Sequence, residues 1–259
     1  MKAVLCLGGS DPTMGAGVQM DTAVCRALGV APRVVETMFT QQGEMGLESV
    51  ELRDMVEIAQ DILHTLDDGV QAIKIGALGD AHIVEAVVAA LEPWHDAIPI
   101  VIDPVAAASK SKTEVYLNTR AGVRLMESHL FPLATVVTPN VLEYGNGERY
   151  ENCKAILRKG GHTDSFAELE GREKSKWVAD VLEYPNGDSF EYRHTRVPGG
   201  ENLHGTGCAL STAIACGLAN GATLSEACHT GIGALQVWMK EAMEGQHDLQ
   251  PTPPAESHE

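Results

Sequence analysis

The first thirty residues, MKAVLCLGGSDPTMGAGVQMDTAVCRALGV (residues 1–30), contain the pattern that decides the fold. The apolar run Ala3–Leu7 predicts a buried strand, and the amphipathic run Val18–Leu28 predicts a helix. A glycine-bearing loop, Gly8–Gly17, joins them. Strand, loop and helix form the first half of a βαβ unit, in which two parallel strands are joined by a crossover.

The same alternation continues along the chain. Further strands are predicted at Arg33–Thr37, Ala72–Ile75, Ile98–Ile102, Thr135–Val137 and Ala155–Leu157, and further helices at Leu52–Leu66, Ala81–Leu91, Thr119–Ser128, Gly207–Leu218 and Leu224–Met243. The turn at Pro185-Asn186-Gly187 predicts a hairpin of Trp177–Glu183 with Ser189–Arg193. The pattern indicates an α/β fold in one domain, residues 1–244, with a mainly parallel central sheet between helices. The Pro- and acid-rich segment 245–259 predicts a disordered tail.

The composition narrows the class of protein. Among 259 residues, 36 acidic side chains outnumber 19 Lys and Arg, for a net charge of −17. Nucleic acids are bound by basic surfaces, so a nucleic-acid partner is not expected. No apolar run approaches the ~20 residues that span a bilayer, and the N-terminus lacks a signal-peptide pattern, so we expect no membrane partner and a cytoplasmic location. A salt-rich cytoplasm is one explanation of the acidity that composition leaves open.

The six cysteines are scattered through the chain without a CxxC pair. Neither a disulfide framework nor a Cys/His zinc site is therefore expected. Most of them are expected to be small buried apolar residues.

The segment LHGTGCALS (residues 203–211) carries a glycine-bearing loop directly into an apolar helix. Unpaired amides and the positive end of the helix dipole meet at such a junction, and glycines let an anion approach closely. Phosphate binding by Gly205, Thr206 and Gly207 is therefore expected. The same field lowers the pKa of a thiol, which makes Cys208 a candidate proton acceptor or nucleophile. A plain loop-to-helix junction with a buried cysteine is the alternative.

Chemically useful residues also follow several predicted strands. The Gly8–Gly17 loop lies after the first strand, where ligands of open α/β sheets bind, but it matches neither a Walker A loop nor a dinucleotide fingerprint. Lys74, Asp103, Asn140, Glu143 and Lys159 lie at other strand ends. Carboxylates suit Mg²⁺, and lysines with a glycine-rich anion site suit phosphates, so the set indicates phosphoryl transfer.

These motifs resemble one family closely. GGSDPTMGAGVQMD (residues 8–21) is similar to the GSDPSGGAGIQAD pattern of the hydroxymethylpyrimidine/phosphomethylpyrimidine kinases of thiamine biosynthesis. KIGAL, VIDPV, TPNxxE, KGGH and HGTGC follow in that family's order, over nearly the whole chain. The resemblance implies a ribokinase-like three-layer sandwich, often assembled as a homodimer. It further implies that MgATP phosphorylates the hydroxymethyl group of 4-amino-5-hydroxymethyl-2-methylpyrimidine and then the resulting monophosphate.

The resemblance also implies roles for single residues. Cys208 matches the catalytic cysteine, and Gly205, Thr206 and Gly207 would contact the transferring phosphoryl group. Asn140, Glu143 and Lys159 match positions associated with ATP, and Asp103 with Glu143 would lie near Mg²⁺. Gln42 aligns with the polar residue that bonds the aminopyrimidine, because an amide both donates and accepts. The rest of the substrate site would be formed by Gly9, Asp11, Gly15, Ala16, Gly17, Ala77 and Val105.

The sequence departs from the family in two places. Thr13-Met14-Gly15 replaces the usual Ser-Gly-Gly, and alanine replaces methionine at Ala77 and Ala106, which indicates either a repacked pocket or a changed ring specificity. The segment TPNVLEYGNGERYENCK (residues 138–154) is also shorter than in the family by about a crossover helix. A true deletion there would uncover the side of the protein on which ATP is expected to bind. A segment that belongs to the protein but is absent from this sequence would leave that side covered.

Two alternative functions remain open at the level of sequence. A pyridoxine/pyridoxal kinase of the same fold uses the same phosphoryl-transfer chemistry and, in some members, the same GTGC ending. A non-catalytic pyrimidine-binding protein is supported only by the short segment.

Overall fold

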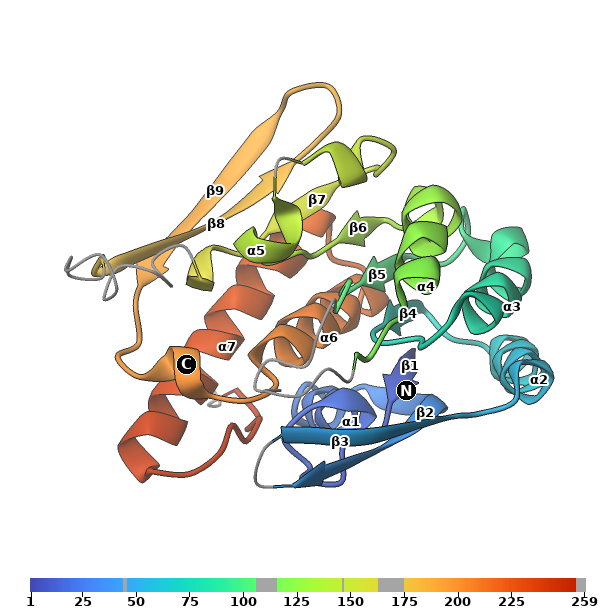
Figure 1. The fold of residues 1–259 in the computed structure, drawn as a ribbon. Coiled ribbons are helices and arrows are strands. Elements are labelled where there is room, and N and C mark those ends of the chain that lie inside the picture. Colours follow the sequence, from blue (N-terminus) through green and yellow to red (C-terminus); the bar gives the residue numbers. More distant parts are fainter. Residues whose placement is uncertain (44–45, 106–115, 146, 163–174, 255–259) are drawn as a thin grey trace.

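A mostly parallel sheet with helices on both faces forms the molecule (Figure 1). The computed structural model describes residues 1–43, 46–105, 116–145, 147–162 and 175–254. Within them the strand order is β3-β2-β1-β4-β5-β6-β7-β8-β9. The six neighbouring strands β2, β1, β4, β5, β6 and β7 run parallel to one another. At the two edges, β3, β8 and β9 are antiparallel to their neighbours. The strands are β1 Ala3–Gly9, β2 Ala31–Gly43, β3 Gly46–Leu52, β4 Ala72–Ile75, β5 Ile100–Ile102, β6 Val136–Val137, β7 Ile156–Arg158, β8 Trp177–Glu183 and β9 Ser189–Thr195.

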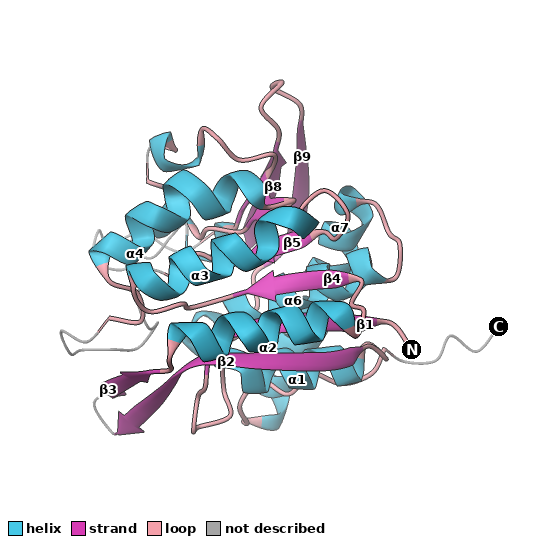
Figure 2. Cartoon of the chain, turned by 90° about the vertical axis from the view of Figure 1, so that its right-hand side faces the viewer, coloured by secondary structure: helices cyan, strands magenta, loops and turns pink. Residues whose placement is uncertain are grey.

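Helices cover the sheet on two sides. They are α1 Gly17–Ala27, α2 Met55–Asp67, α3 Ala81–Leu91, α4 Arg120–Leu125, α5 Val141–Tyr144, α6 Thr206–Ala219 and α7 Leu224–Gly245. Figure 2 shows α2, α3 and α4 in front of the strands, with α6 behind them. The described residues thus form the three-layer α/β sandwich that the sequence predicts.

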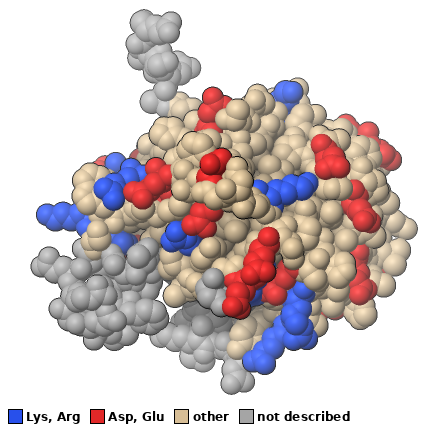
Figure 3. Space-filling view, turned by 90° about the horizontal axis from the view of Figure 1, so that it is seen from above, with Lys and Arg blue, Asp and Glu red and all other residues tan. Residues whose placement is uncertain are grey.

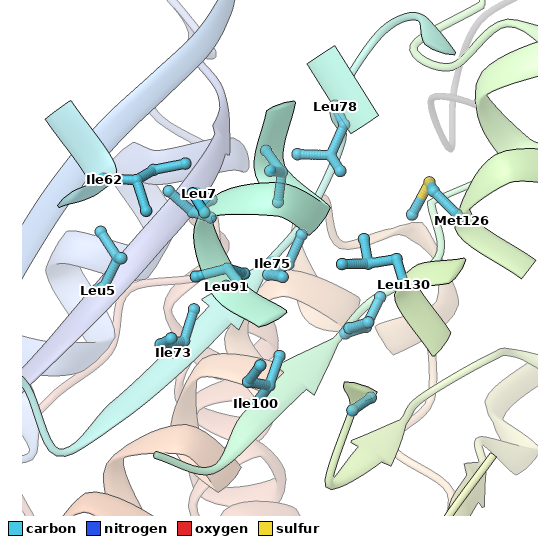
Figure 4. Packing of buried hydrophobic residues seen from close by; sticks show 14 of the residues in the cluster. Leu5, Leu7, Ile62, Ile73, Ile75, Leu78, Leu91, Ile100, Met126 and Leu130 are labelled. Carbon is cyan, nitrogen blue, oxygen red and sulfur yellow. The ribbon is translucent and has the colours of Figure 1, made fainter. Parts of the chain in front are cut away.

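Side chains of alternating strand residues separate the core into two halves. On β1, Leu5 and Leu7 face α2 and α3, whereas Val4 and Cys6 face α1 and α6. Figure 4 shows the first half, in which strand residues such as Ile73 pack against helical leucines and isoleucines. Because β1, β4, β5 and β6 are buried on both faces, they read in the sequence as mostly apolar runs.

Capping side chains mark where several helices begin. Asp54 and Asp80 accept hydrogen bonds from the first amides of α2 and α3. Thr223 and Glu226 form a reciprocal capping box at the start of α7. The hairpin of β8 and β9 also forms, with full pairing from Trp177–Thr195 to Glu183–Ser189.

The edge strand β3 is the main element that sequence reasoning missed. Residues 46–52 read as a loop before a helix expected from Leu52, but they pair antiparallel with β2. The helix begins only at Met55, because Asp54 caps it.

The end of the chain also differs from expectation. Residues 245–254 were expected to be disordered, but Leu249 is buried and Trp238 of α7 donates a hydrogen bond to the carbonyl of Thr252. The apolar side chain of Leu249 in an otherwise polar segment explains the difference. Residues 255–259 lie outside the described chain.

The short connection from β6 to β7 closes the core without a long helix. It consists of α5 and a 3-10 turn at Glu148–Tyr150, residue 146 lying outside the described chain. Tyr150 is buried and stacks on Phe131 at 5.5 Å and on Tyr144 at 5.7 Å between ring centroids. Tyr150 and Phe131 belong to the apolar core on this side of the sheet, and Tyr144 packs against it.

Candidate active site

One cavity of about 580 Å³ lies at the carboxyl ends of the parallel strands. Its volume falls in the range of small-molecule sites, about 300–1,000 Å³. Residues predicted for both halves of the site line it together: Gly9, Asp11, Ala16, Gly17, Ala77, Val105 and Cys208 at one end, and Asp103, Asn140, Glu143 and Lys159 further along. The strand-end positions that the sequence indicated are therefore brought to one place.

The start of α6 forms the anion-binding part of this cavity. Gly205 has φ +78°, and a Cβ at this position would overlap the carbonyl oxygen of Gly15, so only glycine fits. A Cβ on Gly207 would lie 3.2 Å from a carboxylate oxygen of Asp103 and 3.3 Å from Lys159 Nζ. The bare backbone of a 14-residue helix thus meets a lysine and a carboxylate. Its first amides are free of helical partners, as an anion site requires.

Lys159 and Asp103 form a buried ion pair beside those amides. Lys159 Nζ donates to Asp103 Oδ1 at 2.9 Å. Burial lowers the pKa of Lys159, but Asp103 and Glu143 raise it more, so its pKa lies above the usual value and the ammonium stays charged. Asn140 and Lys159 form an isolated parallel β-bridge. The side chain of Asn140 also caps α5, in a capping box with Glu143. All four predicted ATP and metal residues consequently share one part of the cavity.

A second buried ion pair contributes Lys74 to the cavity wall. Lys74, at the end of β4, donates to Asp21 of α1 at 2.9 Å, and Thr212 of α6 donates to the other carboxylate oxygen at 2.7 Å. Burial lowers the pKa of Lys74, but Asp21, Cys208 and Asp103 raise it well above its usual value. Burial likewise raises the pKa of Asp21, against the opposing charge and hydrogen bond of Lys74. This network ties β4, α1 and α6 together under the anion site.

The thiol of Cys208 lies at the site, but its chemistry differs from expectation. The helix terminus was expected to lower its pKa. Burial instead raises the pKa to about 11, with Asp21 and Asp103 acting in the same direction against Lys74 and an amide hydrogen bond from Gly17. Loss of hydration thus outweighs the favourable field, and Cys208 is protonated at neutral pH in the free protein.

The first glycine loop is held against the anion site by Asp11 and His204. Asp11 accepts from His204 Nε2 at 3.1 Å and from the amide and hydroxyl of Thr13. Burial raises the pKa of Asp11, but these hydrogen bonds outweigh it and lower the pKa to about 2. Gly15 is absent from the cavity wall and lies behind it, against His204 and Gly205.

Three further substrate predictions are Gln42, Ala77 and Val105. Gln42 lies in β2 opposite Leu47, but its side chain is outside the described part of the structure, as is all of Ala106. Ala77 and Val105 line the cavity, and the carbonyl of Val105 accepts a hydrogen bond from Asn118 at 2.7 Å.

Sequence reasoning missed the part of the cavity that lies beyond Lys159. It is lined by Val178, Asp180, His194, Arg196 and Val197 around β8 and β9, and by Ile232, Leu235, Gln236 and Met239 of α7. The α7 residues recur at i, i+3, i+4 and i+7, which is also the ordinary spacing of a core-facing helix. Only the polar Gln236 within that apolar face could have indicated a site.

The carboxylates of Asp103 and Glu143 suit a hydrated Mg²⁺ better than a metal ion that is enclosed by protein ligands. Mg²⁺ keeps several waters and takes one or two carboxylates together with substrate phosphates. Asp103 and Glu143 both line the cavity, and both are close enough to Lys159 to raise its pKa. Within the described residues no group of three or more His, Cys, Asp or Glu side chains is arranged to hold a metal. The described helices also include none long and apolar enough to cross a bilayer.

Comparison with known proteins identifies the family of this chain. The model of the phosphomethylpyrimidine kinase family matches residues 11–146 and 148–253. A hydroxymethylpyrimidine/phosphomethylpyrimidine kinase of Mycobacterium tuberculosis is 31% identical, covering 95% of this chain and 90% of its own length. The crystal structure of a phosphomethylpyrimidine kinase from Clostridium difficile matches with a TM-score of 0.72 at 26% identity, over 94% of this chain and all of that one.

A structure of Bacillus subtilis pyridoxal kinase with ADP has a TM-score of 0.75 at 22% identity, over 93% and 92% of the two chains, and so shares the fold. The family match covers the first glycine loop from Asp11 onward and the α6 junction, and both segments line the cavity. The chain belongs to the phosphomethylpyrimidine kinase family.

Proposed function

We propose that the protein transfers the γ-phosphoryl group of ATP to the hydroxymethyl group of 4-amino-5-hydroxymethyl-2-methylpyrimidine, and then to the monophosphate. The observation that carries the proposal is the position of Gly207. Its bare backbone lies beside the Lys159–Asp103 pair, in the same cavity that the first glycine loop, residues 8–17, helps to line. A phosphoryl group at this point contacts helix amides, a cation and the acceptor pocket at once.

The residues of the chain have separable roles in this transfer. The first amides of α6 stabilise charge on the moving phosphoryl group, and Lys159 neutralises charge on the donor. Asp103 holds Lys159 in place. Cys208 lies at the start of α6, where it accepts the hydroxyl proton of the substrate. Because a neutral thiol cannot take up a proton, this step uses the small fraction of the protein in which Cys208 has already released its own proton to solvent and is a thiolate. Transfer is largely a matter of position and charge in such reactions, so this small fraction is sufficient.

Mg²⁺ would be held by Asp103 and Glu143, through water or directly, and would neutralise the charge of the triphosphate. Asn140 fixes Glu143 by accepting its amide hydrogen bond at 2.9 Å. We also propose that the protein is a cytoplasmic homodimer, as the family resemblance implies. Light scattering of the purified chain measures the oligomeric state.

The decisive experiment compares three acceptors under identical conditions: hydroxymethylpyrimidine, its monophosphate and pyridoxal. We expect kcat/KM for hydroxymethylpyrimidine to exceed that for pyridoxal by at least ~10-fold, with diphosphate formed from the monophosphate. A preference for pyridoxal would overturn the proposed acceptor. Absence of ATP consumption with every acceptor would instead support a binding protein.

A further inference from the structure

The wall of the cavity beyond Lys159 is an apolar face of α7 interrupted by one amide. Ile232, Leu235 and Met239 recur on this face, and Gln236 lies among them at the i+4 position. Val197 and Leu203 also line the cavity. Apolar walls with one or two placed polar groups are typical of sites that bind a flat heterocycle.

Buried polar atoms without partners concentrate in this cavity. In the described chain four buried side-chain atoms lack a hydrogen bond, and three of them belong to residues of the cavity wall: His194 Nδ1, His204 Nδ1 and Gln236 Oε1. Buried polar groups in native proteins are almost always paired, so an unpaired one at a cavity indicates a ligand that completes it. Gln236 is the one of the three on the apolar α7 wall.

The position of this wall relative to the phosphate site follows from the chain. Asp180 accepts from the amide of Gly160 at 2.7 Å and from His194 Nε2 at 3.1 Å, which fixes His194 next to the Lys159 loop. His194 belongs to β9, and β9 packs on α7, where the rings of Tyr192 and His229 meet. The cavity therefore runs from Lys159 past His194 to the α7 wall. A nucleotide whose phosphates reach Lys159 has its base on that wall.

We propose that Gln236 reads the base of the phosphoryl donor and makes the site selective for a purine with a 6-amino group. The inference rests on the proposed use of a nucleotide and extends it to the choice of base. A carboxamide can accept from the 6-amino group of adenine through Oε1 while it donates through Nε2 to a neighbouring ring nitrogen. Guanine presents an oxygen at position 6, so the same pair of bonds cannot form in the same pose.

Binding of three nucleotides tests the proposal directly. ADP, GDP and purine riboside 5′-diphosphate, which lacks the 6-amino group, are titrated calorimetrically into the full chain with Mg²⁺. We expect ADP to bind about 10-fold or more tighter than either of the others, since a two-bond amide–base contact discriminates by that order. In Gln236→Leu the advantage of ADP should fall to within about threefold.

Control variants separate base reading from general damage. Val237 is half exposed on the outer side of α7, so Val237→Gln adds an amide outside the cavity and should leave the preference unchanged. Gln236→Glu keeps the acceptor but loses the donors, and should retain part of the preference for ADP. If Gln236→Leu fails to fold, Gln236→Met preserves length and apolar packing and serves the same purpose.

The outcomes distinguish this inference from the proposed function. If folded Gln236→Leu keeps the wild-type ratio of ADP to GDP affinity, the role of Gln236 is wrong while nucleotide use stands. Equal binding of ADP and purine riboside diphosphate to the wild type has the same meaning. If the wild type binds none of the nucleotides, the proposed use of ATP is overturned, and the inference falls with it.

Discussion

The raised pKa of Cys208 determines how its role can be detected at the scale of a residue. With a pKa of about 11, the thiolate is a very small fraction at neutral pH and rises about tenfold per pH unit. If Cys208 accepts the substrate proton, Cys208→Ala should lower kcat by about 10²- to 10⁴-fold. The rate of the wild type should rise between pH 6 and 9, and that of the variant should not. Steady-state kinetics across this range measure both effects.

Cys208→Ser provides the matched control. The hydroxyl preserves shape but ionises far less readily than the thiol, so the increase with pH should disappear in this variant as well. A wild-type rate in folded Cys208→Ala would show that the helix amides and Lys159 carry the transfer without a proton acceptor.

Met14 is a second residue whose conformation has a measurable consequence. It has φ +64°, in the left-handed region, and two-thirds of its surface (67%) is exposed. The family pattern GSDPSGGAGIQAD has glycine at the position of Met14. A non-glycine residue there is strained by ~1–2 kcal/mol, of which the greater freedom of glycine in the unfolded chain offsets part. Met14→Gly should therefore raise the free energy of unfolding by about 0.5–1 kcal/mol in urea titrations.

Met14→Ala tests whether strain is the cause. Alanine keeps the Cβ that makes this backbone conformation unfavourable, and the exposed methionine side chain contributes little packing. The alanine variant should thus match the wild type within about 0.5 kcal/mol. Equal gains from alanine and glycine would contradict the explanation by backbone strain.

At the scale of elements, the connection from β6 to β7 contributes both to the stability of the fold and to the position of the residues proposed to bind ATP. Tyr150 is buried between Phe131 and Tyr144, and its hydroxyl donates to the carbonyl of Glu143 at 3.3 Å. Tyr150→Ala should destabilise the protein by about 3–5 kcal/mol, as large-to-small core changes do. Because α5 carries Asn140 and Glu143, KM for ATP should also rise. Denaturant unfolding and ATP kinetics measure the two effects.

Tyr150→Phe separates the stack from the hydroxyl. It keeps both ring contacts and removes one long hydrogen bond, so it should cost no more than about 1 kcal/mol and leave KM for ATP nearly unchanged. A large rise of KM in this variant would mean that the hydroxyl, rather than the stack, positions α5.

The elements also show why sequence reasoning named residues from one part of the cavity wall and missed those of the other part. Gly205, Asp103 and Lys159 follow strands or begin a helix, and strand ends of a parallel sheet meet at one edge whatever the details of packing. Gln236 lies within an amphipathic helix, whose spacing is the same whether it faces a core or a cavity. The pKa of Cys208 could not be predicted either, because its burial depends on how distant segments pack around it.

For the whole molecule, the net charge of −17 is the property that sequence reasoning could establish most directly. Figure 3 shows acidic side chains spread over the face in view, with basic ones between them and no continuous basic surface. Two cations, Lys74 and Lys159, lie inside the protein in the two buried pairs. The cavity wall thus includes buried cations, although the net charge of the chain is strongly negative.

Self-repulsion of the surface charge should make stability depend on salt. The Debye length falls from ~30 Å at 0.01 M to ~3 Å at 1 M salt, which removes long-range repulsion but leaves buried pairs almost untouched. The thermal unfolding midpoint at pH 7 should therefore rise by several degrees between 0.05 M and 1 M KCl. At pH 4.9, near the sequence pI, the net charge vanishes and the rise should largely disappear. An equal rise at both pH values would assign the effect to salting-out of apolar surface rather than to charge.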